Sequence, residues 1–597
     1  MRTAEAVLGV IRDRGRRGLP LEDIYRQLFN RNLYLHAYGR LARNAGATTP
    51  GSTLETVDGM SLAKIDAIIE ALRFERYRWT PVRRTYIEKK GSTKKRPLGI
   101  PTWSDKLLQE VIRLILEAYF EPQFSERSHG FRAGRGCHTA LREVQETWRG
   151  TAWFIEGDIA QCFDSIDHEV LLAILCETLH DNRFLRLIEN LLRAGYLEDW
   201  TFNATLSGTP QGGVVSPILA NIYLDRLDRF VETVLLPAYN RGTKRGTNVA
   251  YDRLVKLASY YRSTKRFAEA AALVQQTRAL PSVDPQDPEY RRLRYVRYAD
   301  DFLLGFCGPR AEAEEIKRRL AEFLRDTLKL ELSQAKTLVT SARSEAARFL
   351  GYEIVVLQAD EKRTAGRRSI NGQIGLKVPA DVVAAKCAPY VRRGKPVHRP
   401  ERLHESPFSM VEKYQAEFRG IAQYYQLAYN VHRLDRLRWV METSLTKTLA
   451  AKLRISVNKV YRKYRATIET PQGPYKGLQV VVERDGGRTP LVARWGGIPL
   501  RRQKEAVLND QPQNVWNGRT ELLERLLADT CELCGSREHV EVHHVRHLKD
   551  LRRKGRAAMP EWAKWMAARH RKTLVACRAC HEAIHAGQPQ RRKQGAA

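Results

Sequence analysis

Apolar residues recur every three or four positions along much of this chain, the spacing that places them on one face of a helix. The first 80 residues show this spacing at Leu21, Tyr25 and Leu28. The pattern therefore predicts a chain with long helical stretches. The predicted helical regions are about 1–80, 171–185, 218–227, 251–280 and 390–466.

Short apolar runs rich in β-branched and aromatic residues interrupt the helical pattern and predict strands. One run begins at Thr151 and ends in a polar turn after Asp158. Residues 294–306 hold two such runs on either side of Asp300 and Asp301. This arrangement predicts a β-hairpin with both carboxylates at its tip.

A second hairpin is predicted closer to the C-terminus. Residues 478–482 and 490–495 are apolar runs, and Asp485 begins an Asp-Gly-Gly turn between them. Asp-Gly between apolar runs is a strong local signal for a hairpin. The polar stretch 509–514 that follows predicts a linker.

Asp158, Asp300 and Asp301 form the first candidate site. Neighbouring like charges cost free energy unless a cation neutralises them, and carboxylate oxygens are ligands that Mg²⁺ prefers. A carboxylate that ends a buried strand, beside an acidic hairpin tip, would complete a cage for two divalent ions about 3.5–4 Å apart. Such ions activate an attacking hydroxyl and stabilise a leaving pyrophosphate. Three unrelated surface carboxylates are the simpler alternative.

Short motifs surround these carboxylates at residues 96–101, 128–136, 208–217, 298–301, 332–337 and 348–352. In content and order they resemble the motifs of reverse transcriptases, and more narrowly of those that group II introns encode. The resemblance implies a right-hand polymerase with fingers and an antiparallel palm sheet. It also implies that Asp158, Asp300 and Asp301 are catalytic and bind two Mg²⁺ ions.

The same resemblance implies that Lys90, Arg96, Ile159, Phe163 and Gln211 bind a deoxynucleoside triphosphate. Lys90 and Arg96 lie in a run of basic residues suited to a triphosphate, with a solvated basic loop as the alternative. Phe163 matches the aromatic steric gate that excludes a ribose 2′-hydroxyl, and a core phenylalanine is the alternative there. Gln211 would contact the incoming nucleotide.

The chain is strongly basic, with 101 Lys and Arg residues against 68 Asp and Glu residues and a formal net charge of +33. An excess of this size is the electrostatic footprint of a nucleic-acid partner. We see no signal peptide and no apolar span long enough to cross a membrane. We therefore expect a cytoplasmic, nucleoid-associated protein of bacterial type, whose binding to nucleic acid weakens steeply with salt.

The helical region 390–466 is rich in Arg, Lys and Tyr and resembles the thumb, or maturase domain, of intron-encoded proteins. The resemblance implies a surface that holds intron RNA and the template–primer duplex. Interleaved Arg and Tyr at 460–465 suit phosphate contact and base stacking, whereas Phe418 and Ile421 fit a helical core. An insertion at about 237–293 suits either RNA contact or a solvated helical hairpin.

The C-terminal tail contains two Cys-x-x-Cys pairs, Cys531 with Cys534 and Cys577 with Cys580. This spacing is typical of a tetrahedral structural Zn²⁺ site. The other five cysteines of the chain are scattered. A cytosolic compartment disfavours disulfides, so four paired thiols in one short tail indicate a metal.

Histidines accompany these cysteines, at His543, His544, His581 and His585. The set resembles an HNH endonuclease, a ββα fold that grips one catalytic divalent ion, expected here to be Mg²⁺. The resemblance implies that His543, His581 and His585 are the ligands. It implies that His544 is the general base that deprotonates the attacking water. A second structural zinc site and an inactive DNA-binding knuckle are the alternatives.

One position departs from the HNH pattern. The Asn expected before the second Cys pair is not found in residues 571–577, where Lys572 or Thr573 occupies its place. That Asn orients the general base, so its loss bears on the rate and the metal preference of the nuclease.

These inferences predict an RNA-directed DNA polymerase and RNA-splicing maturase of a mobile group II intron. Its HNH nuclease would nick target DNA to prime reverse transcription, so intron RNA and target DNA are the expected partners. The alternatives are a splicing-only maturase with an inactive centre and a retron-like or defence-associated reverse transcriptase. The three carboxylates and Phe163 argue against the first, and the C-terminal tail argues against the second.

The expected fold is multidomain α+β, with several hydrophobic cores in 597 residues. The fingers and palm, the helical thumb and a small zinc-bound ββα domain are its parts. The predicted ranges are 1–85 for an N-terminal extension of the fingers, 86–375 for fingers and palm, 376–470 for the thumb or maturase domain, 471–520 for a β-hairpin and linker that is a candidate DNA-binding region, and 521–597 for the HNH domain.

Overall fold

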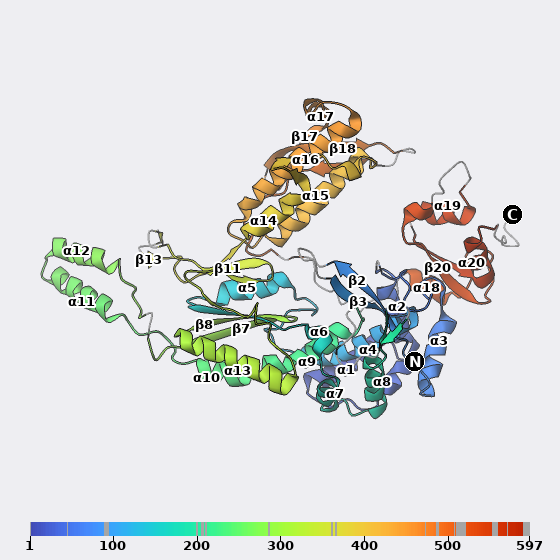
Figure 1. Cartoon of the computed structure of the whole chain (residues 1–597), viewed down its shortest axis with the longest axis horizontal. Coiled ribbons are helices and arrows are strands. Elements are labelled where there is room, and N and C mark those ends of the chain that lie inside the picture. Colours follow the sequence, from blue (N-terminus) through green and yellow to red (C-terminus); the bar gives the residue numbers. More distant parts are fainter. Residues whose placement is uncertain are drawn as a thin grey trace.

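The structure is a mixed α/β assembly of several bodies (Figure 1). A long insertion extends from one end, a helical body stands above the central sheet, and the N-terminal helices adjoin the C-terminal body at the opposite side (Figure 1). The computed structural model describes residues 2–44, 46–88, 95–198, 201–203, 208, 212–284, 287–359, 362–364, 367–471, 473–484, 489–506, 508, 521–551, 559–569 and 571–588.

The N-terminal body is largely helical, as predicted, although Tyr25 and Leu28, which showed the apolar spacing, lie in a 3-10 helix (Ile24–Phe29) and Leu21 bridges to Leu179. Polar side chains cap its helices: Thr3 accepts a hydrogen bond at the start of α1, and Ser61 does the same for α3. Helix α4 is buried along most of its length and forms the centre of the core. The helices are α1 (Ala4–Arg16), α2 (Arg31–Leu41), α3 (Leu62–Arg73) and α4 (Trp103–Phe120).

A four-stranded sheet in the order β3-β2-β5-β6 lies beside this body. Strands β2 and β3 pair antiparallel, and β2 pairs parallel with β5. The strands are β2 (Val82–Glu88), β3 (Lys95–Ile100), β5 (Tyr196–Glu198) and β6 (Thr201–Asn203). The predicted site residues Lys90 and Gln211 both lie outside the described residues.

The central sheet has the order β7-β8-β4-β9, and all its strand pairs are antiparallel. Helix α5 packs on one face, and α10 and α13 lie on the other (Figure 1). Apolar residues on both sides of the strands are therefore buried, which explains the nearly continuous apolar runs. The elements are β4 (Trp153–Asp158), β7 (Arg292–Tyr298), β8 (Asp301–Cys307), β9 (Val339–Ser341), α5 (Cys137–Thr147), α9 (Ser216–Phe230), α10 (Leu236–Tyr239) and α13 (Arg310–Leu328).

Two helical regions each contain a pair of helices, which departs from the single helix predicted over 171–185 and agrees with the helical-hairpin interpretation of the insertion. The region 171–185 contains the end of α7 (His168–Cys176) and the start of α8 (Asn182–Leu192). Asp181 begins α8 by accepting hydrogen bonds from the backbone N–H groups of Arg183 and Phe184. The insertion likewise forms α11 (Val249–Ser263) and α12 (Phe267–Thr277), with Lys265 at a positive φ between them.

The upper body combines helices with a three-stranded sheet, β17-β18-β19. The predicted second hairpin is present as the antiparallel pair β18–β19, and its turn at 485–488 lies outside the described residues. Strands β17 and β18 pair across the limit that we placed at 470/471. The elements are α14 (Ala380–Cys387), α15 (Pro407–Tyr424), α16 (Asp435–Leu453), α17 (Val457–Tyr464), β17 (Arg465–Thr470), β18 (Gly473–Val482) and β19 (Leu491–Trp495).

Trp495 ties this sheet to the helices of the upper body. Its side chain is buried, with its ring 5.6 Å from that of Phe418. Helix and sheet therefore share one core. Shorter elements complete the middle of the chain: α6 (Cys162–Ser165), β10 (Ala347–Phe349), β11 (Tyr352–Val356), β12 (Arg363–Thr364), β13 (Arg367–Arg368), β14 (Ile374–Lys377), β15 (Val391–Arg392) and β16 (Lys395–Pro396).

The C-terminal body contains the expected pair of strands followed by a helix, and it gains a strand from the N-terminal region. Strand β1 (Met60–Ser61) pairs antiparallel with β20, which makes a three-stranded sheet β1-β20-β21. None of the helices that the structure describes is both long and apolar enough to cross a membrane. The elements are α18 (Glu521–Leu527), β20 (Val540–His544), α19 (Glu561–Ala568), β21 (Thr573–Cys577) and α20 (Arg578–His585).

Candidate active sites

The three predicted carboxylates meet at one end of the central sheet. Asp158 is the last residue of β4 and Asp301 the first residue of β8, and the strand register puts them directly opposite each other. Tyr298 pairs with Asp301, so only Ala299 and Asp300 form the hairpin turn. The predicted acidic hairpin is therefore confirmed as a piece of secondary structure.

Burial and mutual repulsion raise the pKa values at this site. Burial and the charge of Asp158 raise the pKa of Asp300, against the lowering effect of Arg96 and Lys336. Burial, the charge of Asp300 and a hydrogen bond with Asp158 together raise the pKa of Asp301 to about 7. The Nζ of Lys336 lies 2.7 Å from Oδ2 of Asp158. Such a site has a surplus of negative charge that divalent cations would neutralise.

A buried ion pair fixes the tip of the acidic hairpin. Arg297 is fully buried, and its Nε and Nη2 donate to the two oxygens of Asp228 at 2.8 and 2.6 Å. Its other contacts are Nη1 to the carbonyl of Ala299 at 2.9 Å and Nη2 to Oγ of Ser128 at 2.8 Å. A Cβ at Gly130 would collide with the backbone of Ala299, so the motif at 128–136 supports the turn directly.

Sequence reasoning missed Arg297 and Asp228. The available signal was Arg297 itself, a charged residue between the strand-forming residues Val296 and Tyr298. Charged groups in such positions are rarely left without a partner, because an unpaired buried charge is very costly. The partner in α9 could not be named without the fold.

Three of the predicted nucleotide-binding residues are described. Arg96 is exposed on β3, and its charge acts on Asp300. Phe163 lies half-buried on α6, with its ring 6.2 Å from that of Phe131. Ile159 is buried, and its backbone bridges to Leu332. The side chain of Ile159 therefore belongs to the core.

Gly208 shows that the neighbouring motif approaches α6 closely. A Cβ at Gly208 would lie 2.7 Å from the backbone of Asp164, and the residue has a φ of +88°. Only glycine combines that conformation with that proximity. Gly208 itself therefore lies against α6 at Asp164.

The four paired cysteines of the tail gather in one place. Their sulfur atoms all lie within 4.8 Å of one another, and the Sγ atoms of Cys534 and Cys577 are 3.6 Å apart. Tetrahedral Zn–S bonds of about 2.3 Å would separate neighbouring sulfurs by about 3.8 Å. The cluster of Cys531, Cys534, Cys577 and Cys580 thus fits a structural zinc site.

The predicted histidine ligands also converge, and Asp58 joins them. One ligand atom from each of Asp58, His543, His581 and His585 lies within 4.8 Å of the others. Nε2 of His581 and Nε2 of His585 are 3.1 Å apart. We call these four residues the histidine site. Two imidazoles held this close, beside a carboxylate, fit one divalent cation.

Carboxylates orient the histidines of this site. Oε2 of Glu541 lies 2.9 Å from Nδ1 of His581, which leaves Nε2 of that ring for a metal. Burial lowers the pKa of His581, but hydrogen bonds with Asp58 and Glu541 outweigh it and raise the pKa to about 9. Burial also opposes ionisation of Asp58, yet His543, His581 and the backbone N–H of His544 hold its pKa well below the usual range.

His544 differs from the other three histidines in its surroundings. Burial lowers its pKa to about 4, so its imidazole is neutral near pH 7, as a general base must be. Its Nε2 lies 2.9 Å from the hydroxyl of Tyr38. In the strand register His544 faces Thr573, the position where the usual Asn was missing. The hydroxyl of Thr573 accepts from Arg525 at 3.3 Å.

The fold and these sites define a nucleic-acid enzyme with two separate centres, one of polymerase type and one of nuclease type. Three family models match the chain. The reverse transcriptase (RNA-dependent DNA polymerase) family matches residues 87–354, the type II intron maturase family matches 373–477, and the AI2M/AI1M-like HNH endonuclease family matches 531–581.

Characterised and putative intron proteins are similar over nearly the whole chain. Group II intron-encoded protein LtrA of Lactococcus lactis subsp. cremoris is 36% identical over 581 residues, which covers 94% of this chain and 95% of LtrA. The putative COX1/OXI3 intron 1 protein of Saccharomyces cerevisiae is 31% identical, covering 93% of this chain and 68% of its own. The chain belongs to the group II intron-encoded proteins: it is a reverse transcriptase and maturase with an HNH endonuclease domain.

Proposed function

We propose that Asp158, Asp300 and Asp301 are the catalytic residues of the reverse transcriptase and would hold two Mg²⁺ ions. The observation that carries this proposal is the register that sets Asp158 opposite Asp301, with their carboxylates in hydrogen-bond contact. When bound, such ions activate the primer 3′-hydroxyl and offset charge on the phosphate oxygens. The buried Arg297 keeps the hairpin tip in position for them.

The residues around the carboxylates would select and bind the deoxynucleoside triphosphate. Arg96, exposed and close enough to act on Asp300, suits the triphosphate. Phe163 would exclude a ribose 2′-hydroxyl, and the backbone of Ile159 would line the same pocket. Lys90 and Gln211 keep the nucleotide-binding roles that the family resemblance gives them.

In this proposal the central sheet is the palm of a right-hand polymerase. The sheet β3-β2-β5-β6 would belong to the fingers, and 1–85 would extend them. The upper body would be the thumb and maturase domain. We propose that it spans 376–506 as one unit, because β17, β18 and β19 share the core of its helices.

The HNH domain would nick target DNA, and the new 3′-hydroxyl would prime copying of the intron RNA at the polymerase site. His543, His581 and His585 would hold a catalytic divalent ion, expected to be Mg²⁺, which supplies charge stabilisation at the scissile phosphate. His544 would take the proton of the attacking water. A Zn²⁺ ion on Cys531, Cys534, Cys577 and Cys580 would be structural.

Intron RNA and target DNA would be the partners, in keeping with the net charge of +33. We expect the protein in the cytoplasm, associated with the nucleoid. One preparation of the full-length protein with its intron RNA tests both centres, by primer extension and by nicking of target DNA.

Asp300→Ala should lower primer extension by about 10²–10³-fold and leave nicking intact, the loss expected when an electrostatic contact to the transition state is removed. His544→Ala should lower nicking by about 10²–10⁴-fold and leave primer extension intact. Asp252→Ala, at a carboxylate paired with Lys256 on the insertion, is the matched control.

Equal absence of primer extension in wild type and Asp300→Ala would instead identify a splicing-only maturase. Nicking that survives His544→Ala would mean that another group is the base. Because primer extension and nicking are measured separately, each result tests one centre independently of the other.

A further inference from the structure

One member of the histidine site comes from the opposite end of the chain. Asp58 precedes His544 by 486 residues, and its Oδ2 lies 2.9 Å from Nε2 of His585. Its Oδ1 is 3.2 Å from Nε2 of His581 and 3.4 Å from Nδ1 of His543. A single carboxylate therefore contacts the ring nitrogens of all three expected metal ligands.

Paired strands hold Asp58 in that place. Met60 in β1 is opposite Val542 in β20, and the N–H of Gly59 donates to the carbonyl of Val542 at 3.1 Å. The N–H of His544 donates to Oδ1 of Asp58 at 2.7 Å. Met60 and Val542 are fully buried in a core shared by the two ends of the chain. The contact is thus part of a packed interface.

A second N-terminal residue covers the general base. Tyr38 lies on α2, is fully buried, and has its hydroxyl 2.9 Å from Nε2 of His544. Its ring meets the imidazole edge to face, with centroids 6.2 Å apart. Nε2 of His544 is therefore already engaged by a protein hydroxyl.

We propose that Asp58 and Tyr38 hold the nuclease closed, with Asp58 as the fourth ligand of its metal, and that the backbone of target DNA opens it. This inference rests on the proposed nicking function. Three imidazoles leave a metal ion with an open position, which a water or a substrate oxygen takes during catalysis. A phosphodiester offers an anionic oxygen of the same kind as a carboxylate, so DNA and Asp58 compete for one position.

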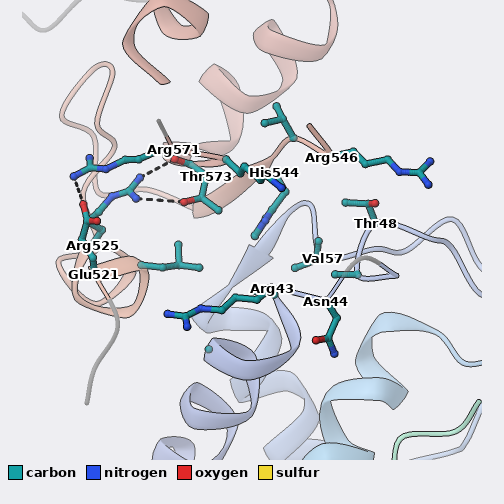
Figure 2. A pocket seen from close by; sticks show the side chains of 16 residues that line it. Arg43, Asn44, Thr48, Val57, Glu521, Arg525, His544, Arg546, Arg571 and Thr573 are labelled. Carbon is teal, nitrogen blue, oxygen red and sulfur yellow. Dashed lines mark hydrogen bonds and ion pairs between the residues drawn. The ribbon is translucent and has the colours of Figure 1, made fainter. Parts of the chain in front are cut away.

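A basic cavity beside His544 indicates that DNA is the competitor. It opens between residues 39–57 of the N-terminal body and residues 521–573 of the C-terminal body, with His544 in its wall (Figure 2). Three of its cations, Arg43, Arg546 and Lys572, have no acidic partner within the described part of the chain. Such cations suit successive phosphates of a DNA strand. A DNA strand bound in this cavity would contact both the general base His544 and the metal of the histidine site.

Asp58→Asn and Tyr38→Phe test the closed state in the full-length protein bound to its intron RNA. If about nine-tenths of the molecules are closed, removing the closed state raises the apparent affinity for DNA about tenfold. We therefore expect both variants to nick subsaturating target DNA up to about tenfold faster than wild type. Asp66→Asn, at an outer ion pair with Arg31, is the control and should behave as wild type.

Hydrogen exchange measured by mass spectrometry gives a readout that does not depend on activity. In wild type, amides of residues 57–61 and 540–544 should lose protection when target DNA binds. In Asp58→Asn they should exchange faster before DNA is added. A protein that never nicks DNA would disprove the proposed function. The hydrogen-exchange data would still show whether the contact between residues 57–61 and 540–544 opens when DNA binds.

Two results overturn the inference. Slower nicking by Asp58→Asn at saturating DNA would make Asp58 a permanent catalytic ligand. Unchanged protection of both segments on DNA binding would mean that the two ends stay joined during cleavage. Faster nicking by the variants, together with DNA-induced loss of protection, supports it.

Discussion

Two aspartates, Asp228 and Asp301, show how the surroundings of a residue determine the free energy of holding it in the charged form. Asp228 is fully buried, but Arg297 contacts both of its oxygens and Tyr295 donates a further hydrogen bond at 2.7 Å. Asp301 has other carboxylates as neighbours, and its pKa rises to about 7. Arg297 thus neutralises the charge of Asp228, whereas the charge of Asp301 is suited to neutralisation by a bound cation.

Asp301→Asn should stabilise the Mg²⁺-free protein at about pH 8 and have little effect at about pH 4. In the folded chain Asp301 keeps its proton up to about pH 7, whereas an unfolded aspartate releases it near pH 4. Folding therefore becomes less favourable as the pH rises through that window, and the full cost is present above it. Asparagine does not ionise and avoids the cost. Thermal unfolding in Mg²⁺-free buffer without a chelator, so that zinc is retained, measures the difference, expected at several degrees.

Mg²⁺ supplies the matched comparison for this pH effect. At about pH 8 the ion should raise the melting temperature of wild type more than that of Asp301→Asn, because the ion removes the repulsion among the carboxylates. Identical melting temperatures of the two Mg²⁺-free proteins at both pH values would contradict a raised pKa for Asp301.

At the scale of elements, the hairpin β7–β8 depends on contacts from outside itself. Its turn contains Ala299 at a φ of +55°, a conformation that costs free energy for a residue with a Cβ. Arg297 holds the carbonyl of that residue, and Asp228 in α9 holds Arg297. The geometry of the acidic tip is therefore a property of the sheet and the helix together.

Asp228→Ala should destabilise the protein by about 3–5 kcal/mol, because it leaves Arg297 buried without a counter-charge. The freed guanidinium no longer positions the hairpin tip, so primer extension should fall as well. Urea unfolding and primer extension measure the two effects. Asp252→Ala, at a partly exposed surface position on α11, should change stability by less than about 0.5 kcal/mol. A variant as stable as wild type would show that Arg297 finds another partner.

Elements also show where a local pattern stops being informative. Apolar periodicity predicted one helix over 171–185, yet α7 ends at Cys176 and Asp181 caps the start of α8. Its other oxygen accepts from the backbone N–H of Tyr25 at 2.8 Å, which anchors the break to the N-terminal body. Periodicity continues through such a break because both helices face the same core. Only the tertiary contact explains why the helix is interrupted there.

At the scale of the whole molecule, the two ends of the chain form one structure. Strand β1 completes the sheet of the C-terminal body, and residues from both ends share a hydrophobic core. The rest of the C-terminal body has only small clusters of buried apolar residues. A body of this size would depend on a structural metal to stay folded.

Removal of zinc should therefore unfold the C-terminal body and leave the central sheet intact. Cys580→Ser, which removes one ligand, should abolish hydrogen-exchange protection in β21 and α20 while β4 and β8 stay protected. Residues 57–61 should lose protection too, because β1 then has no partner strand. Cys176→Ser, at an exposed free cysteine, is the control. Protected β21 and α20 in Cys580→Ser would mean that the N-terminal contact suffices for folding.

The sequence by itself determined the chemistry of both centres: an acidic pair between apolar runs, two Cys-x-x-Cys pairs, and histidines at matching spacing. These signals are local, because strand alternation and ligand spacing act over a few residues. The tertiary structure alone decided the partners from distant segments, such as Asp228 for Arg297, Asp58 for the histidine site and Tyr38 for His544. Such pairings follow from which buried surfaces pack together, and no short stretch of sequence records that choice.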